Sequence, residues 1–160
     1  MNELNHLKVF SKSLMIGIGN CGRSDDGLGW AFVEAVEKGG DFPGDTLLRY
    51  QLQVEDADLI SQYDQVIFVD AYQGGLEDGY TFKKCLAAKD FSFTTHRLPP
   101  ETVLYLCQEL YQKNPNAYML LIDGEKWELE IRLSELGQKN LQKALNFFEE
   151  EIIFKAAVLK

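Results

Sequence analysis

Residues 14–29 read LMIGIGNCGRSDDGLG and carry the clearest structural signal in the chain. The apolar run over 14–19 predicts a buried strand, and the glycines and polar residues that follow it predict a loop. From Leu28 to Glu37, apolar residues recur at helical spacing until Gly39-Gly40 ends the helix. The chain is therefore expected to begin with a strand, a loop and a helix in that order.

Strands and helices continue to alternate along the rest of the chain. Further strands are predicted over 46–52, 65–69, 80–85 and 117–122, and further helices over 55–62, from Pro99-Pro100 and from about Ser134. The strand over 80–85 could run antiparallel to the others. We predict a single α/β domain over residues 1–160, a three-layer sandwich with a mainly parallel twisted sheet and helices on both faces. Residues 1–12 are expected to form a flexible N-terminal segment.

The composition restricts the class of protein. A formal net charge of −9 would repel nucleic-acid phosphates, and no stripe of Lys and Arg offsets it. Three cysteines without a CxxC spacing predict neither a disulfide framework nor a thiolate zinc site, and they fit a reducing cytoplasm. No apolar run resembles a signal peptide or reaches membrane-spanning length. We therefore expect a cytoplasmic protein that binds neither nucleic acid nor membranes.

Three residues are candidates for a functional site. Asp26 closes the first loop, Asp70 follows the strand over 65–69, and His96 precedes the helix at Pro99-Pro100. Ligands of such sheets bind where loops leave the carboxyl ends of the strands, so Asp26 and Asp70 are expected at one edge. Two carboxylates and an imidazole could bind nickel, zinc or manganese and leave positions open. Each residue alone also has an ordinary structural explanation, such as capping a helix or anchoring a loop.

The same first loop allows a different class of protein. Its Gly17-x-Gly19-x-x-Gly22 spacing matches the dinucleotide-binding fingerprint. The second predicted strand, however, lacks the closing acid that would hold a ribose, and Asp25 and Asp26 would repel a pyrophosphate. A nucleotide- or dinucleotide-binding enzyme of small molecules stays open as the alternative.

The motif around residues 14–29 resembles the N-terminal signature of the hydrogenase maturation proteases, a GxGN…R-x-D-[DE]-G-x-G pattern. The VIFVDA segment over 66–71 is similar to the family's second acidic segment. Thr95-His96, the helix after it, Pro115 and the AYMLLI strand keep the family's order. The similarity runs from about residue 14 to residue 148, and it departs at residues 97–100 and 123–127.

The resemblance implies a function and a set of site residues. Family members are endopeptidases that remove a C-terminal extension from the large subunit of nickel–iron hydrogenases after nickel insertion. By this resemblance Asp26, Asp70 and His96 are the catalytic and metal-contacting residues, and the nickel is supplied by the precursor. No organic cofactor is expected, and the protein is expected to act as a monomer on that precursor. A module that binds the metalloprotein without cleaving it is a third reading.

Overall fold

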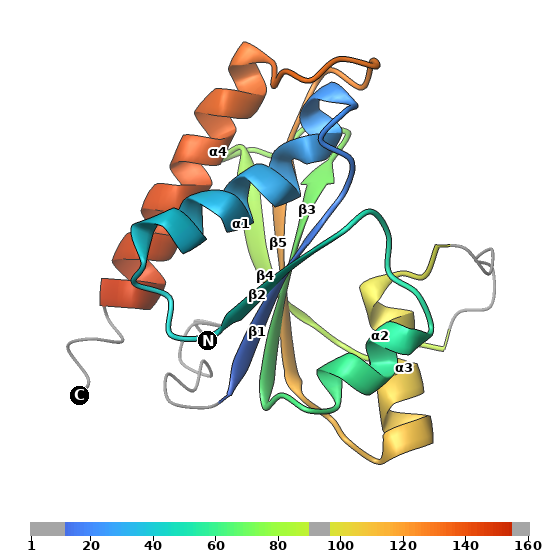
Figure 1. Cartoon of the computed structure of the whole chain (residues 1–160). Coiled ribbons are helices and arrows are strands. Elements are labelled where there is room, and N and C mark those ends of the chain that lie inside the picture. Colours follow the sequence, from blue (N-terminus) through green and yellow to red (C-terminus); the bar gives the residue numbers. More distant parts are fainter. Residues whose placement is uncertain (1–11, 90–96, 155–160) are drawn as a thin grey trace.

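The apolar run at the start of the chain forms the second strand of a five-stranded sheet (Figure 1). The computed structural model describes residues 12–89 and 97–154, so most of the predicted N-terminal segment, 1–12, lies outside the described residues. The strands are β1 (Ser13–Ile18), β2 (Asp45–Arg49), β3 (Gln65–Tyr72), β4 (Tyr80–Cys85) and β5 (Asn116–Asp123). The helices are α1 (Leu28–Gly39), α2 (Glu55–Ile60), α3 (Pro100–Tyr111) and α4 (Glu135–Phe147), with a 3₁₀ turn η2 (Ser24–Gly27) and a π-helical turn η3 (Phe148–Phe154).

The strand order is β2-β1-β3-β5-β4, and only β4 runs antiparallel to its neighbour. This confirms the predicted mainly parallel sheet and the antiparallel direction of β4. Helix α1 connects β1 to β2 over one face, whereas α2 connects β2 to β3 over the other (Figure 1). The order of the strands therefore reverses between β1 and β3. In open α/β sheets, the carboxyl ends of the strands at such a reversal form the usual ligand crevice.

Both faces of the sheet are buried because strand residues alternate between two apolar cores. Leu14 and Ile16 of β1 belong to the core under α2 and α3, whereas Met15 belongs to the core under α1 and α4. Phe68 and Val69 of β3 divide in the same way. The near-continuous apolar strands of the sequence follow from burial on both faces.

Two element ends differ from the sequence prediction for reasons that lie elsewhere in the chain. Strand β2 ends at Arg49, because Leu52 leaves the sheet and forms a bridge with Leu98. Strand β3 continues to Tyr72 along β5, so Asp70 lies within the strand and not after it. In the described part of the chain, no helix is both long and apolar enough to cross a bilayer.

Candidate functional site

Asp26 lies in the turn that follows β1, at the point where the strand order reverses. Its backbone carbonyl fills the space where a side chain would stand on Gly19, which has a φ of +139°. Only glycine is tolerated there. The amide of Asn20 donates to Asp26 Oδ2 at 3.1 Å, which fixes the carboxylate against the loop. The family-like glycines therefore place this acid at the crevice.

Asp70 lies on the neighbouring strand, on the face covered by α2 and α3. Its Oδ1 accepts the amide of Ala71 at 2.8 Å. The pKa of the Asp70 carboxyl is raised to about 7. Burial is the main cause and the negative charge of Asp26 adds to it, whereas the Ala71 amide and the charge of Arg97 act to lower the pKa. The two carboxyl groups are therefore near enough for their charges to interact. A carboxyl that titrates near neutrality can bind a cation or exchange a proton with a substrate.

His96, the third predicted site residue, lies outside the described residues. The chain directly after it does reach the same edge: the Leu98 amide donates to Leu52 O at 3.2 Å, and the charge of Arg97 lowers the pKa of Asp70. Within residues 12–89 and 97–154, no group of three or more His, Cys, Asp or Glu side chains could hold a metal ion. In the described chain the charges of Asp26 and Asp70 interact, and their role as metal ligands with His96 stays a prediction.

Asp25 has a different role from the adjacent Asp26, and the sequence pattern did not reveal that role. Its buried carboxylate accepts the amides of Glu125 and Lys126 and both the amide and the hydroxyl of Ser134, at 2.6–3.0 Å. Burial acts to raise the pKa of Asp25, but these four hydrogen bonds together lower it. Asp25 therefore anchors the loop that leads into α4. Its partners lie about a hundred positions away, so no local motif could have revealed them.

The first loop is not shaped to bind a dinucleotide phosphate. The amides of residues 22 and 23 both donate to Asn20, through its side chain and its carbonyl. The amides of residues 19, 20 and 24–26 donate to other protein oxygens. A phosphate-binding glycine loop needs free amides. The fingerprint-like spacing of glycines here serves close packing.

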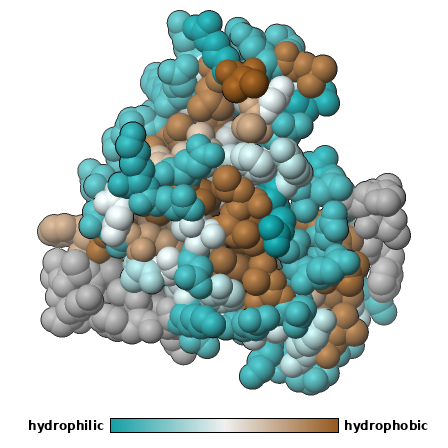
Figure 2. Space-filling view, viewed as in Figure 1, coloured by the Kyte–Doolittle hydropathy of each residue, from teal (hydrophilic) through white to brown (hydrophobic). Residues whose placement is uncertain are grey.

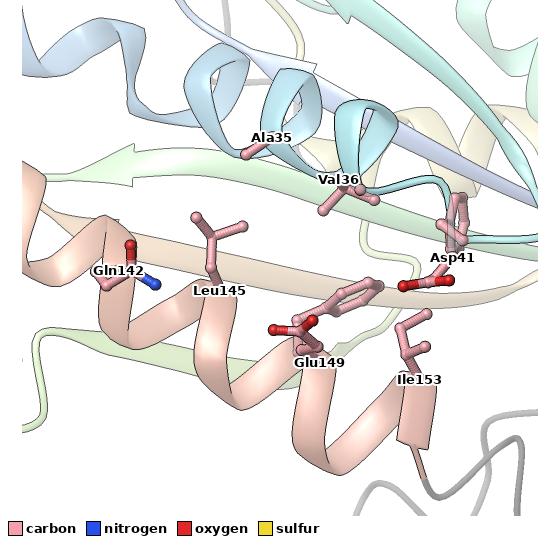
Figure 3. A pocket seen from close by; sticks show the side chains of 10 residues that line it. Ala35, Val36, Asp41, Gln142, Leu145, Glu149 and Ile153 are labelled. Atoms are coloured by element: carbon pink, nitrogen blue, oxygen red, sulfur yellow. The ribbon is translucent and has the colours of Figure 1, made fainter.

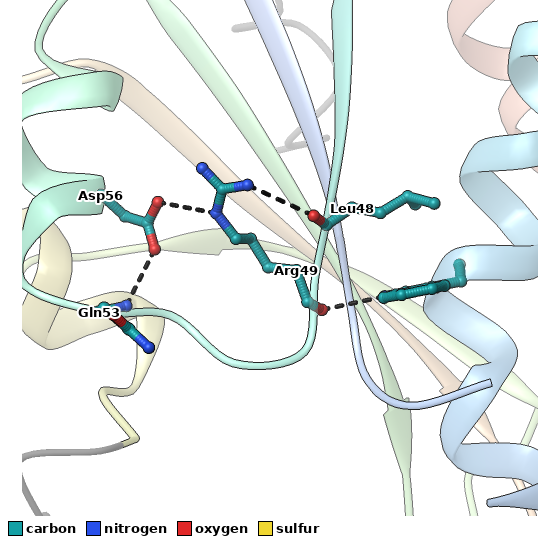
Figure 4. A network of polar contacts seen from close by, with 5 residues as sticks. Leu48, Arg49, Gln53 and Asp56 are labelled. Carbon is teal, nitrogen blue, oxygen red and sulfur yellow. Dashed lines mark hydrogen bonds and ion pairs between the residues drawn. The ribbon is translucent and has the colours of Figure 1, made fainter. Parts of the chain in front are cut away.

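A polar network closes the edge on the β2 side (Figure 4). The guanidinium of Arg49 contacts Asp56 of α2 at 3.2 Å, and Asp56 also accepts the Gln53 amide at 2.9 Å. The carbonyl of Arg49 accepts the amide of Gly19 and the indole N–H of Trp30, each at 2.9 Å. The end of β2 is thereby tied to α2, to the first loop and to α1.

A hollow lies between the carboxyl-terminal parts of α1 and α4 (Figure 3). It has a volume of about 180 Å³ and is lined mainly by apolar side chains, among them Val36, Leu145 and Ile153. Val36 and Leu145 lie near the carboxyl ends of α1 and α4, and Ile153 lies in η3, whereas Asp26 precedes the other end of α1. This hollow is therefore separate from the candidate site.

Several solved structures share this architecture. The [NiFe] hydrogenase maturation protease HycI from Thermococcus kodakarensis superposes with a TM-score of 0.69 at 23% identity, over 89% of this chain and 94% of that one. The hydrogenase maturating endopeptidase HybD from E. coli gives 0.68 at 18% identity, over 90% and 93%. An uncharacterized protein from Wolinella succinogenes gives 0.56 at 20% identity, over 94% and 100%. No protein-family model and no curated protein matches the sequence.

The chain is therefore a doubly wound α/β domain with paired acids at its reversal point. More particularly, it has the fold of the [NiFe] hydrogenase maturation proteases, as the resemblance of its motifs implied.

Proposed function

We propose that this protein is an endopeptidase that removes the C-terminal extension from the large subunit of a nickel–iron hydrogenase after nickel insertion. The observation that carries the proposal is the pairing of Asp26 with Asp70 at the reversal point of a fold shared with such proteases. The family-like motifs around both acids, and their order with His96, support it as well.

The two acids suit recognition of a cation that arrives with the substrate. Two carboxyl groups in one crevice repel each other when both are ionised, and a divalent metal relieves that repulsion. Nickel accepts oxygen and imidazole ligands, so Asp26, Asp70 and His96 would contact the nickel of the precursor together. Cleavage would then follow metal loading. The partner is the large-subunit precursor, and the protein acts in the cytoplasm as a monomer with no organic cofactor.

The test is to incubate the protein with nickel-loaded and nickel-free precursor and to follow precursor mass. We expect loss of the C-terminal extension from the nickel-loaded form only. Asp26→Asn, Asp70→Asn and His96→Ala should each abolish processing, whereas Asp41→Asn, an exposed acid beyond the far end of α1, should process normally. An unchanged mass with tight binding would instead identify a binding module, and full activity in a site variant would remove that residue from the proposal.

A further inference from the structure

Two highly exposed apolar side chains lie next to the loop that carries Asp26. Leu129 and Ile131 are 80% and 87% exposed. They flank Glu130, which forms a parallel bridge with Arg23. The chain bends at both residues, and both side chains are exposed to solvent. Isolated exposed leucines are common on protein surfaces, but two such side chains within three residues of one loop, beside a candidate site, require an explanation.

The backbone that presents these side chains is firmly held. The Ser24 amide donates to Glu130 O at 2.8 Å, and the Ser24 hydroxyl donates to Glu128 O at 3.0 Å. Earlier in the same loop, the Asp25 carboxylate accepts hydrogen bonds from the amides of residues 125 and 126. The exposed pair is thus preorganised, and a partner that binds it has little loop entropy to remove.

A second apolar group consists of Trp30 on α1 and Tyr50 directly after β2, and it adjoins Ile131 through Trp30. The ring of Trp30 lies 4.9 Å from the ring of Tyr50, which is 66% exposed. Trp30 and Ile131 both line a hollow of about 160 Å³, whose walls include Cys21 and Leu133. We call Trp30, Tyr50, Leu129 and Ile131 the apolar patch. Brown atoms show at the top of the space-filling view (Figure 2), where the loop before α4 lies in Figure 1.

We propose that the apolar patch docks the folded body of the protein substrate while its C-terminal extension enters the crevice at Asp26 and Asp70. This inference rests on the proposed function. Its basis is continuity: the loop over 20–27 forms a wall of the hollow through Cys21, Ser24 and Gly27, and the same loop carries Asp26. A substrate segment that reaches Asp26 brings the protein attached to it against this wall.

The chemistry of the patch fits a protein partner better than a short peptide alone. Stable protein interfaces bury about 800 Å² on each side, and their binding energy is concentrated in a few aromatic and aliphatic anchors near the centre. The patch supplies two aromatic and two aliphatic side chains of this kind. Exposed Glu34, Glu128 and Glu130 adjoin it, as do the exposed arginines Arg23 and Arg132, so the complementary surface is apolar with a rim of mixed charge.

The experiment compares the double variant L129D/I131D with a matched control, L110D. Leu110 is 55% exposed on α3, whose last turn leads to the amino edge of the sheet, opposite the candidate site. The substrate is the nickel-loaded large-subunit precursor from the same organism, and the readouts are Kd, KM and kcat. We expect L129D/I131D to raise Kd and KM by roughly tenfold or more, with kcat within about twofold of wild type. L110D should match wild type, and the conservative variant I131V should also bind like wild type.

Each outcome bears on one proposal. Unchanged Kd and KM in L129D/I131D, with normal cleavage by wild type, would overturn the docking surface and leave the proposed function intact. A wild-type dimer that dissociates in L129D/I131D, again with unchanged KM, would assign the patch to self-association. If wild type neither binds nor cleaves the precursor, the proposed function itself fails. Melting temperatures of both aspartate variants near that of wild type would show that the altered side chains act at the surface.

Discussion

Asp25 accepts four hydrogen bonds from residues 100 to 109 positions later, whereas the carboxylate of Asp26 accepts one from the Asn20 amide. Adjacent acids of the same type thus have separable roles. The first stabilises the fold, and we assign the second to the substrate. The sequence presented them as one pair of acids, because the partners that distinguish them come from the other end of the chain.

The substitution Asp25→Asn is expected to lower the free energy of unfolding at pH 7 by about 2–3 kcal/mol, because an amide cannot accept all of these bonds. The pKa of Asp25 is lowered in the folded state, so its contribution is present above the unfolded value and is lost as the pH falls through the folded value. Urea denaturation across pH 2–7 should therefore show a flatter acid dependence in the variant. Asp26→Asn serves as the control, with a loss below about 1 kcal/mol; equal losses in both variants would contradict the assignment.

Asp70→Asn is expected to make the isolated protein more stable at pH 8. The folded pKa of about 7 lies above the unfolded value of about 3.9, so the folded state binds this proton more tightly. Its contribution to the free energy of unfolding falls as the pH rises from about 4 to about 7. Above that range the carboxyl is ionised in both states, and its burial lowers the free energy of unfolding by the full amount. Removing the charge should raise the free energy of unfolding by about 1–3 kcal/mol at pH 8 and by little at pH 4. If the variant is less stable than wild type at pH 8, the ionised carboxylate of Asp70 does not destabilise the free protein.

At the scale of elements, the packing of α1 against the sheet depends on Gly29. A side chain there would lie 2.5 Å from the carbonyl oxygen of Val69 and 2.6 Å from that of Ile18. Both neighbours are backbone atoms, which cannot move aside without shifting β3 or β1. The first turn of α1 is therefore in closest contact with the sheet beside the candidate site.

Gly29→Ala should lower the free energy of unfolding by about 1–3 kcal/mol, despite the better helix propensity of alanine. Gly39 offers a matched control at the other end of α1, because a side chain there meets nothing within 4 Å. Gly39→Ala should raise stability by about 0.5–1 kcal/mol. Denaturation of the two variants in parallel measures both signs, and a stabilising Gly29→Ala would exclude the close approach of α1.

The elements themselves were predictable, because each depends on near neighbours in the sequence. The spacing of apolar residues predicted β1, α1 and α3, and the alternation of strands and helices predicted that Asp26 and Asp70 would lie at the same edge of a parallel sheet. What local patterns could not predict are contacts between distant segments. The early end of β2 results from pairing of Leu52 with Leu98, and the anchoring of the loop before α4 results from Asp25.

At the scale of the whole molecule, one sheet separates two apolar cores, and the buried cysteines lie in only one of these cores. Cys85 and Cys107 are buried in the core under α2 and α3, whereas Cys21 is exposed in the first loop. Both tryptophans, Trp30 and Trp127, lie near the carboxyl edge of the sheet, Trp30 on α1 and Trp127 in the loop before α4. Thiol reactivity and tryptophan fluorescence therefore monitor different parts of the fold.

We expect the exposed Cys21 to react rapidly with a disulfide reagent at pH 8, and the buried Cys85 and Cys107 to react only on unfolding. Burial raises the pKa of Cys85 to about 12 and also raises that of Cys107, and the thiolate is the reactive form. Because both cores contain residues of the same strands, loss of one core should destabilise the sheet that supports the other. The urea midpoint for labelling of Cys107 should then coincide with that of tryptophan fluorescence, as a single cooperative transition requires. Labelling at clearly lower urea would show that α2 and α3 detach first and that the crevice beside Asp70 opens independently of α1 and α4.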